Sequence, residues 1–242
     1  MNPKDISSAR KLFSSIKTKA TRLKRARAVL CVPYLYIESL SRLKNIKIEL
    51  GAQDAYHESE GAFTGRISTN MLKKAGVKYV ILGHSEMRAT GDTNKEVNKK
   101  IKKALEDRLM VVLCVGEIVR DEEGAYLSFI SDELQESLMK VPKEFFKNVI
   151  VAYEPIWAVG AKSKNVDTPA DFLEKAIFIR KILSHITEKH IAMKIPILYG
   201  GSVNENNCEG FLRDGKADGL LIGRASLDKD SFGAILKIAD SI

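Results

Sequence analysis

Apolar residues gather along this chain in seven short runs, and each run is followed by a stretch with helical periodicity. The runs are continuously apolar rather than alternating, which predicts strands that are buried on both faces. Strands of this kind form parallel sheets covered by helices. The predicted strands are 28–32, 46–50, 79–82, 111–115, 149–153, 195–199 and 219–222, and the predicted helices are 4–25, 36–43, 68–76, 94–107, 124–140, 169–190, 205–213 and 230–240.

The order of these elements is typical of an α/β protein of the (β/α)8 barrel class, and 242 residues suit one such domain. No linker rich in proline, glycine or serine interrupts the chain, so we expect a single domain over residues 1–242. The chain opens on a predicted helix, and about seven strands and eight helices are found, whereas a closed barrel needs eight strands. An open sheet of seven strands would expose two edges beside the missing position.

Composition argues against a membrane or secreted protein. No apolar run reaches the roughly 18 residues that a membrane helix needs, and the N-terminal residues contain no apolar signal segment. The three cysteines, Cys31, Cys114 and Cys208, show no CxxC spacing, and two of them lie in predicted strands. This pattern indicates reduced thiols in a cytoplasmic protein rather than a disulfide framework or a metal site.

The net charge of +8 is concentrated in the first predicted helix. One interpretation is a nucleic-acid-binding surface, and the other is a solvated helix face. No aromatic residues are interleaved with the charges, which favours the solvated face. A positive field would also attract a small anionic substrate. The basic residues are Arg10, Lys11, Lys17, Lys19, Arg22, Lys24, Arg25 and Arg27.

Two predicted strands end in residues that are able to carry acid–base chemistry. Glu154 follows the strand 149–153, and Pro155 ends that strand because proline has no N–H for the ladder. A carboxylate at a strand tip is a candidate general base, although a lone glutamate there is more often a surface residue. His84 follows the strand 79–82 and is a candidate acid or electrophile, or else a hydrogen-bonded structural histidine.

Two late strands end in glycine, which allows backbone N–H groups to approach an anion closely. The strand 195–199 is followed by Gly200, Gly201 and Ser202, and the strand 219–222 by Gly223 and Arg224. Barrels of this class bind phosphate at the loops after their last two strands. A single Gly-Gly pair would predict only a turn, but two such tips favour a phosphate site.

Seven blocks follow one another along the chain: Gly51-Ala-Gln53, Gly61-Ala-Phe-Thr-Gly65, Ile81-Leu-Gly-His-Ser-Glu86, Cys114-Val-Gly-Glu117, Ala152-Tyr-Glu-Pro-Ile-Trp157, Tyr199-Gly-Gly-Ser-Val203 and Asp218-Gly-Leu-Leu-Ile-Gly223. In this order they resemble the triosephosphate isomerase family, over nearly the whole chain. The resemblance implies a TIM barrel without its first strand. It also implies interconversion of dihydroxyacetone phosphate and D-glyceraldehyde 3-phosphate through an enediolate, in glycolysis and gluconeogenesis, with no metal or organic cofactor.

The resemblance also implies roles for individual residues. Glu154 matches the base that moves the proton between two carbons of the triose, and His84 matches the neutral imidazole that polarises the oxygens. The positions whose backbone amides would hold the phosphate are Gly160, Ser202, Gly223 and Arg224. Supporting positions in the matching motifs are Ser85, Glu86, Glu117, Trp157, Tyr199, Gly200 and Gly201.

Two segments match mobile or docking parts of the family. The polar stretch 162–167 corresponds to a lid that would exclude water from the enediolate. The loop 61–65, with Phe63 and Thr64 at its tip, resembles the arm that docks into the other subunit of the family's homodimer. A disordered surface loop is the alternative, but the unbroken match favours docking.

The chain departs from the family's pattern at its start. The family begins with a strand that ends in Asn-x-Lys-x-Asn, whose lysine contacts the substrate, and Met1-Asn2 matches only the tail of that motif. Lys4 and Lys11 lie in the following helix and do not replace the lysine, and Glu86 would lack its partner. Losing one preorganised donor costs about 3–4 kcal/mol. We therefore expect that the native product starts before Met1 and that the 242-residue form is poorly active and aggregates.

Two smaller departures concern the lid and the subunit interface. The lid sequence at 161–167 is longer than the family usually has. Arg66 stands where an acidic residue is usual and Met87 where arginine is frequent, so one charge pair is lost. Three rival interpretations are a non-catalytic scaffold, a nucleic-acid-binding protein and an enzyme for another sugar phosphate. Retention of both Glu154 and His84 argues against the scaffold.

Overall fold

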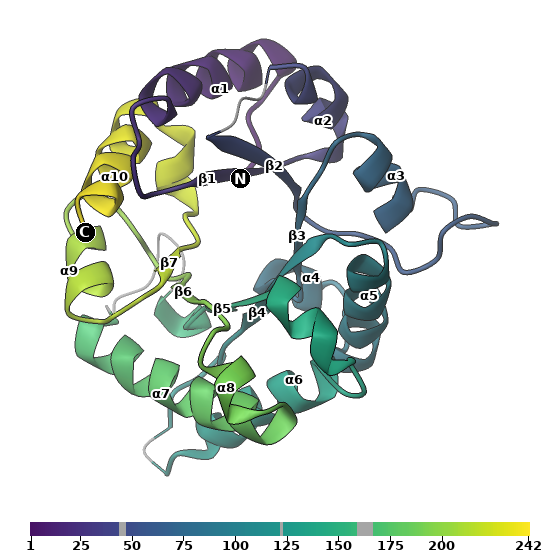
Figure 1. The fold of residues 1–242 in the computed structure, drawn as a ribbon, viewed down its shortest axis with the longest axis vertical. Helices are drawn as coiled ribbons and strands as arrows, with labels where there is room; N and C mark the ends of the chain where they lie inside the picture. Colours follow the sequence, from purple (N-terminus) through teal and green to yellow (C-terminus); the bar gives the residue numbers. More distant parts are fainter. Residues whose placement is uncertain (44–46, 122, 159–166) are drawn as a thin grey trace.

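The structure of the chain, a computed structural model, describes residues 1–43, 47–121, 123–158 and 167–242. Within these residues, seven parallel strands form one curved sheet in which each strand pairs with the next along the chain (Figure 1). This is the α/β arrangement of a TIM barrel with one strand fewer. The strands are β1 (Ala28–Val32), β2 (Ile48–Ala52), β3 (Tyr79–Leu82), β4 (Met110–Val115), β5 (Val149–Tyr153), β6 (Ile197–Tyr199) and β7 (Gly219–Leu220).

Helices surround the sheet on its outer face (Figure 1). The described α-helices are α1 (Ile6–Ala20), α2 (Tyr34–Ser41), α3 (Thr69–Lys74), α4 (Ser85–Ala89), α5 (Asn94–Glu106), α6 (Ala125–Ser137), α7 (Pro169–Ile186), α8 (Lys189–Ala192), α9 (Cys208–Arg213) and α10 (Lys229–Ser241). Three 3₁₀ helices are η1 (Lys143–Asn148), η2 (Ile156–Ala158) and η3 (Arg224–Leu227). None of the described helices is both long and apolar enough to span a membrane.

The two faces of the sheet carry separate cores, because successive side chains of a strand point to opposite faces. Leu113 and Val151 belong to the large core between the sheet and the helices. A smaller cluster fills the opposite face, inside the barrel, and consists of Ile81, Val112, Cys114 and Ala152. The alternation along β4 and β5 therefore decides which residues reach the barrel interior.

The first and last helices lie side by side (Figure 1). Among the described strands, β1 and β7 are the ends of the sheet order and do not pair with each other. Phe13 of α1 and Phe232 of α10 share one buried cluster with Leu50 of β2. Asp240 of α10 accepts the backbone N–H groups of residues 24–26 at 2.7 to 2.9 Å. These contacts join the two ends of the sheet through helices rather than through strand pairing.

The basic residues of the first helix lie outside its apolar face. The buried residues of α1 are Ala9, Phe13, Ile16 and Ala20, spaced three and four apart as in an amphipathic helix. Lys19 is paired with Asp230 of α10 at 3.1 Å. This arrangement supports a solvated helix face. The three cysteines are all free thiols, and two of them, Cys114 and Cys208, are buried.

Several element boundaries differ from the sequence predictions by one to three residues, as in β2, β6 and β7, and three differences are larger. The predicted helix 169–190 is wrong at its end. The helix α7 stops at Ile186, and the backbone of Thr187 is extended (φ −131°, ψ −168°) before α8 begins. The predicted first helix runs too far, because α1 ends at Ala20 and the following segment turns toward Asp240. The short helix α4 was not predicted. It follows His84, whose side chain accepts the N–H of Glu86.

Candidate active site

Glu154 lies at the carboxyl end of β5 and points into the barrel. Ile150 and Ala152 pack with the interior cluster, and Glu154 continues the same alternating face two residues further on. Its backbone N–H donates to Val115 of β4 at 2.8 Å, so the strand pairing reaches the tip itself. The residue is only 4% exposed, and a buried carboxylate of this kind needs polar partners.

His84 is the principal partner of Glu154. Strand alternation from Ile81 would turn residue 84 away from the interior, but Gly83 adopts a left-handed conformation (φ 71°) and redirects the chain. As a result, Nε2 of His84 lies 3.1 Å from Oε1 of Glu154. The backbone N–H of Ser85 approaches the other oxygen of Glu154 at 3.4 Å. The tips of β3 and β5 therefore bring a carboxylate and an imidazole into direct contact.

Burial and the neighbouring carboxylates act in opposite directions on the pKa of His84. Burial disfavours the imidazolium, but the hydrogen bond and charge of Glu154, with the charge of Glu86, outweigh burial and raise the pKa of His84. Nδ1 of His84 accepts the backbone N–H of Glu86 at 3.2 Å, which favours a form with no proton on Nδ1. The resemblance implied a neutral imidazole. The raised pKa differs from it because Glu154 touches His84 directly.

The carboxyl ends of β6 and β7 lie at the same edge of the sheet as Glu154. A Cβ on Gly200 would lie 2.8 Å from Cγ of Glu154, so the glycine leaves the space that the carboxylate occupies. Ser202 donates its hydroxyl to the carbonyl of Ala158 at 2.9 Å. Gly223 stands next to open space and immediately precedes η3, whose first N–H groups have no intrahelical partner. The loops after β6 and β7 thus lie at the same edge of the sheet as Glu154, and among the described glycines of these loops Gly200 is the one that approaches the carboxylate closely.

The supporting residues fall into two groups beside this centre. Oε1 of Glu117 accepts the hydroxyl of Tyr153 at 2.9 Å and the indole N–H of Trp157 at 2.7 Å. Tyr199 places its hydroxyl over Gly201, where an added Cβ would be 2.2 Å from that oxygen. The hydrogen bonds of Glu117 connect the segment after β4 to the tip of β5 and to η2, while Gly201 leaves room for the Tyr199 hydroxyl at the tip of β6.

The remaining predicted positions lie elsewhere or are not described. Gly160 and positions 161–166 of the predicted lid lie outside the described residues. Glu86 is exposed on α4, and Arg224 is exposed at the start of η3. Phe63 and Thr64 are exposed in the segment between β2 and α3, which extends away from the rest of the molecule (Figure 1). Phe63 packs on the ring of Tyr56, with ring centroids 5.1 Å apart.

Two charged residues behind the site were not identified from the sequence pattern. Arg88 of α4 and Glu133 of α6 form an ion pair of 3.1 Å, in which Glu133 is buried. A signal was present, because Glu133 falls on the same helix face as the buried Ile130 and Leu134. A carboxylate on an apolar helix face indicates a specific polar partner.

Asp167, the first described residue after the predicted lid, is a buried carboxylate. Within the described residues neither of its carboxyl oxygens has a hydrogen-bond partner, and Nη1 of Arg120 is 4.0 Å away. Burial raises the pKa of Asp167 to about 7, with a further increase from the charge of Asp171 that Arg120 partly offsets. A carboxyl pKa above its usual value means that the folded state binds the proton more tightly. The resulting contribution to the stability of the folded chain is complete below the pKa that this carboxyl has in the unfolded chain. It is lost as pH rises through about 7, the pKa in the folded chain.

Asp167→Asn is therefore expected to stabilise the chain at about pH 8 more than at about pH 5.5. The neutral amide removes the cost of burying a charge. The gain in unfolding free energy caused by the substitution should therefore be about 1–2 kcal/mol larger at pH 8 than at pH 5.5. Urea unfolding of both chains at each pH measures it. An equal gap in unfolding free energy at the two pH values would contradict the buried-charge explanation.

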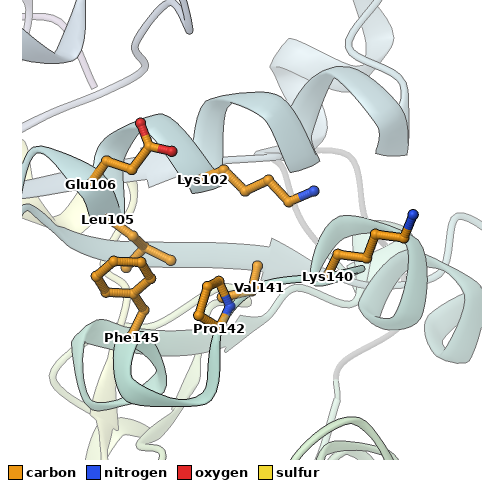
Figure 2. Close-up of a pocket in the computed structure, with 7 residues that line it drawn as sticks. All are labelled: Lys102, Leu105, Glu106, Lys140, Val141, Pro142 and Phe145. Carbon is orange, nitrogen blue, oxygen red and sulfur yellow. The ribbon is translucent and has the colours of Figure 1, made fainter.

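A surface pocket of about 260 Å³ lies between α5 and η1, as Figure 2 shows, with Lys140 and Glu106 at opposite ends. Its residues immediately precede β4 and β5, which places them at the amino-terminal edge of the sheet. The candidate catalytic residues follow the strands and lie at the other edge. Barrels of this class carry their chemistry at the carboxyl edge. The lining residues are Lys102, Leu105, Glu106, Lys140, Val141, Pro142 and Phe145.

Comparisons with known proteins agree over the length of the chain. The sequence profile of the family described as triosephosphate isomerase matches residues 1–239. A triosephosphate isomerase of Cytophaga hutchinsonii is 41% identical over 214 residues, covering 86% of this chain and 83% of the relative. One from Dictyostelium discoideum is 41% identical and covers 85% and 80%. One from Natranaerobius thermophilus is 35% identical and covers 95% and 90%.

Proposed function

Because the chain belongs to the triosephosphate isomerase family, we propose that Glu154 and His84 are its catalytic pair. The family defines the reaction, which is the interconversion of dihydroxyacetone phosphate and D-glyceraldehyde 3-phosphate, an aldose–ketose isomerisation of glycolysis. The observation that carries the assignment of the pair is the 3.1 Å approach of Nε2 of His84 to Oε1 of Glu154.

The chemistry of the two groups suits this reaction. The carboxylate of Glu154 removes a proton from the carbon next to the carbonyl and returns it to the neighbouring carbon, so no net proton is gained. Nε2–H of His84 donates a hydrogen bond to the oxygen on which negative charge develops. The imidazole also relays the hydroxyl proton from the oxygen that becomes the new carbonyl to the former carbonyl oxygen, so both protons of the isomerisation are accounted for. Substrate between the two side chains replaces their direct contact. The bond from Glu86 N–H to Nδ1 then keeps the imidazole neutral, with its proton on Nε2.

The phosphate of the triose is assigned to the adjacent strand tips. The backbone N–H groups assigned to this role are those of Ser202, Gly223 and Arg224, which follow β6 and β7, and that of Gly160. Amides at a helix start carry partial positive charge and suit a dianion. Gly200, Gly201 and Tyr199 shape that edge, while Ser85, Glu117 and Trp157 support the tips that carry the pair.

His84→Gln is expected to lower kcat about a hundredfold and to leave KM within threefold. Glutamine keeps a hydrogen-bond donor but not the rigid imidazole that stabilises the developing charge. Steady-state assays with glyceraldehyde 3-phosphate measure this effect. The matched control is His185→Gln on the exposed surface of α7. The proposed role of His84 would be wrong if both variants turned over within threefold of the unsubstituted chain.

The subunit arrangement is the second part of the proposal. The exposed loop that carries Phe63 and Thr64 docks into a second copy of this chain, which makes the enzyme a homodimer. The tilted packing of Phe63 against Tyr56, and the guanidinium of Arg66 5.3 Å from the centre of the same ring, support a docking tip that is already ordered in the single chain. Light scattering should give twice 26.9 kDa, and a mass of one chain would exclude the dimer.

We also propose a single domain over residues 1–242 and a cytoplasmic location, the latter supported by three free thiols. Two or more independent unfolding transitions would exclude the single domain, and recovery of the protein from a secreted fraction would exclude the location. The relatives named above support the enzyme rather than the non-catalytic alternative. In the comparisons and in the described part of the chain, no observation favours that alternative.

A further inference from the structure

The carboxylate of Glu133 lies behind the strand tips that carry the proposed catalytic pair. It projects from α6, which packs outside the sheet, and it is 2% exposed. Burial raises the pKa of Glu133 to about 7, although Arg88 and the N–H of Gly116 lower it. An apolar side chain here would extend the buried face formed by Ile130 and Leu134 without this penalty. The carboxylate therefore calls for a role beyond packing.

One oxygen of Glu133 holds the tip of β4 against Glu154. Oε2 accepts the backbone N–H of Gly116 at 2.8 Å. Gly116 is pressed so closely onto the main chain of Glu154 that an added Cβ would lie 1.8 Å from the Glu154 carbonyl oxygen. The residues on either side of Gly116 accept hydrogen bonds from the backbone N–H groups of Glu154 (2.8 Å) and Ile156 (3.1 Å). Displacing Gly116 therefore displaces Glu154.

The other oxygen of Glu133 reaches the tip of β3. Oε1 lies 3.1 Å from Nε of Arg88, and the same Nε donates to the carbonyl of Gly83 at 2.7 Å. Gly83 directly precedes His84 and sets its direction through a φ of 71°. Nη1 of Arg88 also donates to Asn94 at the start of α5, which fixes the guanidinium on a second element.

We propose that Glu133 is a positioning residue for the isomerisation, holding the tips of β3 and β4 so that His84 and Glu154 keep their separation. This inference rests on the proposed function of that pair. A misplacement of about 1 Å between reacting groups lowers the rate of a positioned reaction by as much as a hundredfold. Glu133 acts through Gly116 and Arg88 and does not touch the substrate.

Glu133→Gln is the variant that tests this role. The amide keeps the shape of the side chain, but its NH₂ group must face either Gly116 N–H or the Arg88 guanidinium, both of which are donors. We expect kcat to fall about tenfold or more while KM for glyceraldehyde 3-phosphate stays within threefold. The matched control is Asp132→Asn, which removes a charge from the adjacent exposed position of α6 and should leave kcat within twofold.

A purely structural role predicts a different pattern, in which Glu133→Gln lowers the unfolding midpoint but the folded fraction keeps a kcat within twofold of the control. That result would overturn the proposal. If Glu133→Gln does not fold, Arg88→Lys decides instead, because lysine keeps the charge but lacks the Nε that holds Gly83. A tenfold lower kcat supports the proposal, and an unchanged kcat overturns it.

Failure of this inference is distinguishable from failure of the proposed function. If Glu154→Gln leaves kcat unchanged, the catalytic pair itself is wrong. If Glu154→Gln is inactive but both Glu133→Gln and Arg88→Lys have normal kcat values, the pair stands and only the positioning role fails.

Discussion

Replacing Glu154 with glutamine is expected to lower kcat by about 10³- to 10⁴-fold, which corresponds to about 4–5.5 kcal/mol in the activation barrier. The amide has nearly the same shape and still accepts the N–H of Ser85 through its oxygen, but it cannot take a proton from carbon. The residue is buried at a strand tip, so no solvent-exposed carboxylate can take its place. Turnover of glyceraldehyde 3-phosphate at saturating concentration measures the effect.

The control for this variant is Glu144→Gln, the same change at an exposed position of η1. Circular dichroism and the unfolding midpoint should be close to those of the unsubstituted chain for both variants, because the substitutions conserve volume. The proposal that Glu154 is the base would be abandoned if its variant retained a tenth or more of the original kcat while folded.

Gly116→Ala is expected to have the second largest effect, on stability and on activity together. The new Cβ would lie 1.8 Å from the carbonyl oxygen of Glu154 and 2.5 Å from its carbonyl carbon, and backbone atoms cannot rotate away as a side chain does. The strands β4 and β5 must separate to accommodate it. Overpacking of this kind costs about 1–3 kcal/mol or more. The displacement of Glu154 should lower kcat about a hundredfold.

Urea unfolding and steady-state kinetics measure the two effects in one preparation. The matched control is Gly210→Ala in α9, where the nearest atom to the added Cβ is Cγ of Pro169 at 3.1 Å. That side-chain ring can give way, so the control should lose little stability and no activity. An equally small effect at Gly116 would show that the close approach of β4 to Glu154 is not required.

Much of the fold was predictable because the strands are continuous apolar runs with clear ends. Both ends of the strand at 149–153 were predicted correctly. Pro155, two positions after the strand, has no backbone N–H and cannot continue the strand pairing. The direction of Glu154 follows from strand alternation once the interior face is known. The direction of His84 does not, because it depends on the left-handed backbone of Gly83.

The residues that the sequence did not reveal depend on neighbours that are distant along the chain. Glu133 meets Gly116 and Arg88, which lie 17 and 45 positions earlier, and no local pattern relates them. Asp167 looked like part of a polar lid, although its side chain is buried. The break of the long helix at Thr187 has no proline or glycine to mark it.

The order of the sheet has a consequence for synthesis of the protein. Each strand pairs with the one before it, so a nascent chain emerging from the ribosome can add strands one at a time by local contacts, which form quickly. The hydrogen bonds between Asp240 and the amides of residues 24–26 span more than 210 positions and form only after residue 240 has been synthesised. Until then Phe13 of α1 lacks its packing partner Phe232 of α10, so apolar surface of the kind that promotes aggregation stays exposed on the unfinished chain.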